Sequence, residues 1–115
     1  MEKLNLKFTA QSVDEIEQAR QLPIQNCMSD NSVKMLALFI QKGLVNEDGR
    51  VGVSRAVALD TINNYLEDSD TDNLLLDITE ALVNAGFLSR ELDVAKLRER
   101  RDKALSQTMT ALDEI

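Results

Sequence analysis

The stretch SVKMLALFIQKG, residues 32–43, decides the fold class because its apolar side chains cover nearly every face of a helix. A helix that is apolar all round is usually buried at the centre of a domain. Lys42 and Gly43 predict its C-terminal end, since a cation suits the last turn and glycine tolerates the left-handed conformation. The apolar residues of this stretch are Val33, Met35, Leu36, Leu38, Phe39 and Ile40.

Other helical patterns lie on both sides of this central helix. Before it, Ser12 and Glu15 form a capping box that predicts a short helix, with Val13 and Ile16 inward, ending before Pro23. Residues 26–32 are then predicted to be a linker. After it, Ser54 is the expected N-cap of a helix whose inward residues are Val57, Ala58, Ile62, Tyr65 and Leu66.

A further helix is predicted from about Asp72 to Ala85, with Gly86 as its C-terminal left-handed residue. Its expected core residues are Leu74 or Leu75, Ile78, Ala81, Leu82 and Ala85, with Phe87 and Leu88 packing back on it. The fold class is therefore mainly α, with about five helices in a compact bundle. The fifth of these helices is the C-terminal one.

Two short stretches alternate as strands do. Leu4, Leu6 and Phe8 predict an N-terminal β-strand. Val51 and Val53, after the turn signal Asp48-Gly49, form the other alternating stretch, so residues 50–53 are the expected internal partner. Another copy of the chain is the alternative partner.

The chain divides into residues 1–90, a compact helical domain with the N-terminal strand, and residues 91–115, a C-terminal helix. The apolar stripe of this last helix is thin, and the basic run KLRERRDK, residues 96–103, lies beside it. The run is read as a solvated helix face or as a contact with a protein partner, because Glu99 and Asp102 interrupt its arginines.

The amino-acid composition limits the classes of function that the chain can have. The 115 residues are 43% hydrophobic, 29% charged and 3% aromatic, which is typical of one soluble globular domain with few platforms for stacking bases. The net charge of −7 argues against a nucleic-acid partner. A single cysteine, Cys27, indicates a reducing, cytoplasmic environment, and no apolar run is long enough to predict a membrane segment.

Catalysis and metal binding are not indicated. The chain has no histidine, which removes the histidine-dependent triads and zinc sites, and its four glycines form no phosphate loop, so we expect no enzyme and no cofactor. Residues 68–80 place Asp68, Asp70 and Asp72 as in a calcium loop, but Asn73 and Thr79 replace its glycine and its bidentate glutamate. These aspartates are therefore read as an acidic turn and a helix N-cap.

Three segments together resemble the tail assembly chaperones of long-tailed bacteriophages of Gram-positive hosts. They are KFT at residues 7–9, SVDEIE at residues 12–17 and NAGFL at residues 84–88, in that order. Residues 1–3 are too short for the first strand of the N-terminal hairpin that is frequent in this family. The resemblance implies a non-catalytic protein that acts in the cytoplasm of the infected or lysogenic host and is absent from the mature virion.

The partners that the resemblance implies are the tape measure protein and the major tail protein, with self-association of the chain left open. The expected contact surface is the last helix, unless its apolar residues pack on the preceding helix instead. A small acidic helical regulator, such as an antitoxin or a nucleic-acid-mimicking inhibitor, is the alternative function. The candidate partner-binding residues are Val94, Leu97, Leu105, Met109 and Leu112.

Overall fold

A computed structural model describes residues 4–89, 94–100 and 102–103. Residues 4–89 form five helices, and residues 94–100 and 102–103 are helical as well. The mainly α-helical fold class is therefore confirmed. The helices are α1 (Ala10–Arg20), α2 (Ile24–Cys27), α3 (Val33–Gly43), α4 (Arg55–Leu66) and α5 (Thr71–Ala85).

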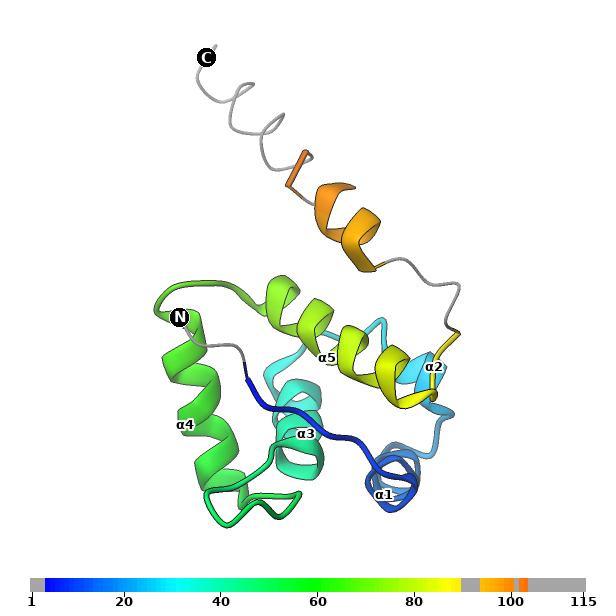
Figure 1. Cartoon of the computed structure of the whole chain (residues 1–115), viewed down its shortest axis with the longest axis vertical. Coiled ribbons are helices and arrows are strands. Elements are labelled where there is room, and N and C mark those ends of the chain that lie inside the picture. The colour runs from blue at the N-terminus through cyan, green and yellow to red at the C-terminus, as the bar shows by residue number, and fades with distance from the viewer. Residues whose placement is uncertain (1–3, 90–93, 101, 104–115) are drawn as a thin grey trace.

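Helix α3 lies at the centre of the domain, as its apolar sequence predicts. It packs against α1, α4 and α5, and Figure 1 shows these three helices arranged around it. Ser32 caps its start by accepting a hydrogen bond from the N–H of Met35. Val33, in the first turn, is an exception to the apolar burial, since 49% of its surface is exposed. The α3 residues with no exposed surface are Met35, Leu36, Ala37, Phe39 and Ile40.

Gly43 has a different role from the predicted one. It is the last residue of α3, and the cap that follows, Leu44, is extended rather than left-handed. A Cβ atom on Gly43 would lie 2.5 Å from the Cε1 and Cζ atoms of Phe8. Phe8 in turn meets Phe39 edge to face, with 6.3 Å between ring centroids. Glycine stands at this position because an aromatic ring packs directly on the helix backbone.

The first helix begins earlier than its capping box predicts. Thr9 is the N-cap, its Oγ1 accepts from the N–H of Ser12 at 3.1 Å, and Ser12 is buried within the helix. Threonine is, like serine, a preferred N-cap residue, so the helix starts at Thr9, three residues before the predicted cap. Val13 and Ile16 are buried, as predicted.

Helix α2 was not predicted, and its last two residues overlap the start of the predicted linker, residues 26–32. Its first N–H, on Ile24, donates at 2.8 Å to the Glu17 carboxylate of α1. The side chain of a neighbouring helix therefore satisfies one of the donors that a helix start leaves unpaired. A four-residue helix is too short to show a hydrophobic period, which is why the sequence did not predict it.

The predicted N-terminal β-strand is not formed, and no strand occurs elsewhere in residues 4–89. Leu6 makes a single antiparallel bridge to Leu44, with hydrogen bonds from Lys7 to Gly43 and from Val45 to Asn5. The predicted pairing of residues 4–8 with residues 50–53 is also wrong. Only two extended residues, 44 and 45, separate α3 from the turn at residues 46–49, so the pairing cannot extend into a ladder.

Val51 bridges Val45 on the side away from residues 4–8. Residues 44–45 therefore lie between the N-terminal segment and residues 50–52. The turn signal itself is confirmed, because Gly49 has a φ of 81° and the Asn46 side chain accepts from the N–H groups of Asp48 and Arg50.

The later helix boundaries follow the predicted caps. Ser54 caps α4, Asp70 caps α5, and Gly86 ends α5 in the left-handed conformation with a φ of 91°. On α4 the predicted inward residues Ala58, Ile62 and Tyr65 are buried and Leu66 is half-buried, but 45% of the surface of Val57 is exposed. On α5 the buried predicted residues are Leu74, Ile78 and Leu82, while Ala81 is half-buried and Ala85 is exposed.

Candidate partner-binding site

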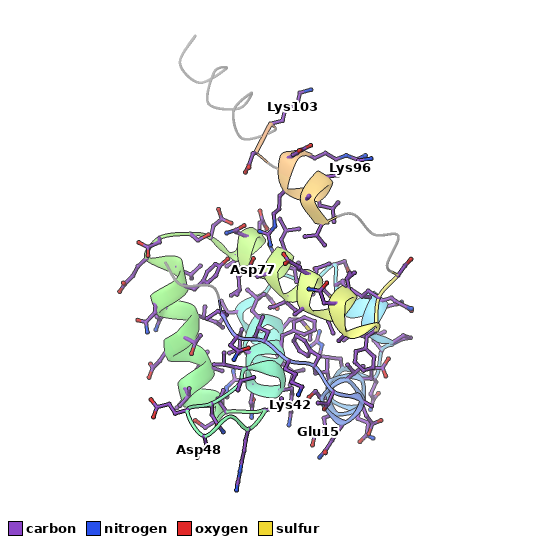
Figure 2. The ribbon with its side chains drawn as sticks, in the orientation of Figure 1. Glu15, Lys42, Asp48, Asp77, Lys96 and Lys103 are labelled. Atoms are coloured by element: carbon purple, nitrogen blue, oxygen red, sulfur yellow. The ribbon has the colours of Figure 1, made fainter. Side chains whose placement is uncertain are left out.

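Arg98 joins the C-terminal helical residues to α5. Its Nη2 atom lies 2.6 Å from Asp77 Oδ1 and 3.2 Å from Glu80 Oε2, and its Nη1 donates to Asn73 Oδ1 at 2.9 Å. Figure 2 shows Asp77 on the side of α5 that faces residues 94–100. We call the side chains of Asn73, Asp77 and Glu80 the acidic site of α5.

A second set of hydrogen bonds, from α4 and from the turn before α5, fixes the side chains of the acidic site. The Tyr65 hydroxyl, on α4, donates to Asp77 Oδ2 at 2.7 Å. The Asn73 amide donates to the Tyr65 hydroxyl at 3.0 Å and to Ser69 Oγ at 2.8 Å. These bonds fix the orientation of both the carboxylate and the amide oxygen that Arg98 meets.

The electrostatics agree with this arrangement. Burial, and then the hydrogen bond to the Asp77 carboxylate, raise the pKa of Tyr65 above its ordinary value of 10.0. Burial alone would lower the pKa of Arg98, but the hydrogen bonds and charges of Asp77 and Glu80 outweigh it and raise that pKa. The guanidinium and the phenol both therefore keep their protons at neutral pH.

Of the five predicted partner-binding residues, the structure describes two, Val94 and Leu97. Val94 keeps only 9% of its surface exposed, and Leu97 is half-buried. A partner that contacts Val94 must therefore first displace the helical residues 94–100 from the domain. Leu105, Met109 and Leu112 lie outside the described residues.

Arg98 is the residue that sequence reasoning missed. The basic run was read as a solvated face or a partner contact, whereas Arg98 is bound within the chain. One signal was available: Arg98 follows Val94 by four residues and so shares the face of the apolar stripe. Its partners could not be identified, because Asp77 is 21 residues away and resembles many other acidic residues of the chain.

Two of the hollows on the domain bear on the candidate site. The larger, about 940 Å³, lies between the start of α1, the turn after α3 and the start of α4, and the ion pair of Lys42 with Glu15 at 3.5 Å lies at its wall. The smaller, about 480 Å³, lies between residues 4–8 and α5 and shares Asp77 and Glu80 with the acidic site. The apolar residues lining the larger hollow are Leu44, Val45, Val51, Val53 and Val57.

The other groups considered from the sequence have structural roles. Burial raises the pKa of the Cys27 thiol, which disfavours its reactive thiolate form. Asp70 accepts from the N–H of Asn73 as the N-cap of α5, and Asp72 accepts from the Asn31 side chain at 2.7 Å. In the part of the chain that the structure describes, no three metal-ligating side chains cluster.

Comparison with known proteins gives no match to a family model, a curated protein or a solved structure. Within residues 4–89, 94–100 and 102–103, no helix is long and apolar enough to cross a membrane.

Proposed function

We propose that this chain is a non-catalytic tail assembly chaperone of a long-tailed bacteriophage. It binds the tape measure protein, and also tail tube subunits, and keeps them soluble in the host cytoplasm until they assemble. The order of the three segments KFT, SVDEIE and NAGFL supports this proposal, as does the net charge of −7, which helps a complex with an apolar partner stay soluble.

One structural observation carries the proposal furthest. The C-terminal helical residues are attached to α5 through the partly exposed ion pairs of Arg98, and Val94 is not part of the main hydrophobic cluster. An attachment of this kind contributes little to global stability compared with core packing. The helix can therefore leave the domain and offer Val94 and Leu97 to a partner helix.

Co-expression with the candidate tape measure protein tests the proposal. The candidate is chosen by looking beside the gene for this chain for a gene that encodes a long, helix-rich protein. We expect its soluble fraction to rise and a complex to co-purify. Unchanged solubility without a complex contradicts the proposal, and a toxin-like neighbouring gene would favour the acidic regulator.

A matched pair of variants tests the contact surface. Leu97→Glu places a charge on the half-buried stripe, whereas Ala95→Glu places the same charge on an exposed position of the same helix. Both substitutions are made in the Arg98→Ala chain, which lacks the ion pairs to α5, so that neither charge acts by weakening that attachment. We expect the first to reduce complex yield about tenfold, and the second to leave it unchanged, since desolvating an unpaired carboxylate is unfavourable. Equal yields from both variants would exclude this stripe as the contact.

A further inference from the structure

The acidic site of α5 is built by the domain and not by the arginine that occupies it. Asn73, Asp77 and Glu80 are spaced four and three residues apart, so one face of α5 presents all three. Tyr65 and Ser69 hold the first two from α4 and from the turn before α5. The acceptors are therefore in place whether or not Arg98 is bound.

The charges of this site specify the group that it accepts. Two carboxylates face one guanidinium, and only 13% of the Asp77 side chain is exposed. This low exposure belongs to the state in which residues 94–100 cover the site, and in that covered state the Asp77 carboxylate requires a cation beside it. The three acceptor oxygens meet two different nitrogens of Arg98, which a planar guanidinium supplies and a lysine ammonium does not.

The occupant also has an apolar part. Val94 lies one helical turn before Arg98 and is largely buried. The surface therefore accepts a helix with an aliphatic residue followed four positions later by an arginine. The chain's own residues 94–100 have this pattern, so they show directly what chemistry the surface binds.

We infer that this surface of α5 binds a helix of the tape measure protein that carries an aliphatic residue and an arginine four positions later. Residues 94–100 occupy the surface in the free chain and are displaced by the partner. This inference rests on the proposed function and names the kind of segment recognised. A tethered helix acts at an effective concentration on the order of millimolar, so the partner binds more weakly than it would to an uncovered surface.

A peptide in trans tests the surface directly. The probe is a fluorescent peptide of residues 94–103, stapled between positions 95 and 99, which are both exposed in the chain. Fluorescence anisotropy is measured with the full-length chain and with its Arg98→Ala variant. We expect the variant to bind the peptide at least about tenfold more tightly, because its own helix no longer competes.

The arginine requirement has its own controls. A peptide with alanine in place of Arg98 should lose binding to the variant, and one with lysine should bind more weakly than the parent peptide. The double variant Asp77→Asn, Arg98→Ala should also lose binding while keeping its circular dichroism spectrum. The inference is overturned if the variant binds no peptide, if it binds no better than the wild-type chain, or if the alanine peptide binds as well as the parent.

Co-expression with the tape measure protein separates this inference from the function on which it rests. We expect Arg98→Ala to raise the yield of complex and the double variant to lower it. Equal complex from all three chains overturns the inference and leaves the chaperone function standing. If no chain forms a complex although the peptide binds, the chaperone function fails and so does its tape measure partner, while the α5 surface remains a helix-binding site.

Discussion

At the scale of single residues, the packing of Phe8 on Gly43 ties the N-terminal segment to the central helix. Gly43→Ala would place a Cβ atom 2.5 Å from the Phe8 ring. We expect this variant to lower the free energy of unfolding by about 1–3 kcal/mol, the usual range for overpacking. Chemical denaturation measures the change. Adding Phe8→Leu should recover part of the loss, whereas a more stable Gly43→Ala would mean that helix propensity outweighs the contact.

Tyr65 allows a second residue-scale test, because it is the only tyrosine of a chain that has no tryptophan. Its raised pKa means that the folded chain keeps a proton that the unfolded chain releases near pH 10. The stability from this group is therefore present below pH 10 and is lost as the pH rises above it. We expect the ultraviolet absorbance of tyrosinate to appear above pH 10 in the folded chain.

Asp77→Asn provides the matched comparison for that titration. It removes the negative charge that the Tyr65 hydroxyl faces but keeps an oxygen acceptor. We expect the pKa of Tyr65 to move towards its ordinary value without reaching it, since burial remains the larger cause. An identical titration in both chains would show that Asp77 does not act on Tyr65.

At the scale of elements, the structure shows which signals a single sequence carries. Helix α3 was predictable because its apolar residues cover nearly every face, and α5 because it has an apolar period that ends at Gly86. The partner of residues 4–8 was not predictable, because an alternating apolar pattern indicates an extended segment but does not identify the segment that it pairs with. Leu44 and Val45 are simply two adjacent apolar residues after a helix, without a strand-like period.

The attachment of the C-terminal helical residues gives the first prediction at this scale. Arg98→Ala should lower hydrogen-exchange protection in residues 94–100 by about tenfold or more, while protection in α3 stays the same. In the Arg98→Lys variant this protection should lie between the values of the wild-type chain and of Arg98→Ala, since a lysine keeps the charge but lacks the several N–H donors of a guanidinium. Arg100→Ala is the control, because Arg100 is exposed on the same helix. Equal loss from Arg98→Ala and Arg100→Ala would contradict the role of the acidic site.

Removal of residues 95–115 gives the second prediction at the scale of elements. We expect the shortened chain to fold, with a loss of less than about 2 kcal/mol, because partly exposed ion pairs contribute little. Leu82→Ala in the full chain calibrates the assay, since truncating a fully buried leucine costs about 2–5 kcal/mol. Thermal melting by circular dichroism compares the two. A shortened chain that does not fold would place the last helix in the core.

At the scale of the whole molecule, the chain combines a small helical core, a net charge of −7, and C-terminal helical residues attached through Arg98 and the largely buried Val94. The core is centred on α3 and is formed by all five named helices together with Phe8 and Leu88. Its fold class followed from one apolar stretch. Its candidate site did not, because the contact between Arg98 and α5 depends on how distant segments meet in space.

The central claim is that this chain keeps a long helical partner soluble by binding it. The most direct measurement is light scattering while the candidate tape measure protein is diluted from denaturant. We predict that an equimolar amount of this chain suppresses the scattering, because apolar helix faces are covered before they associate. Scattering that is unchanged even with this chain in excess would contradict the claim.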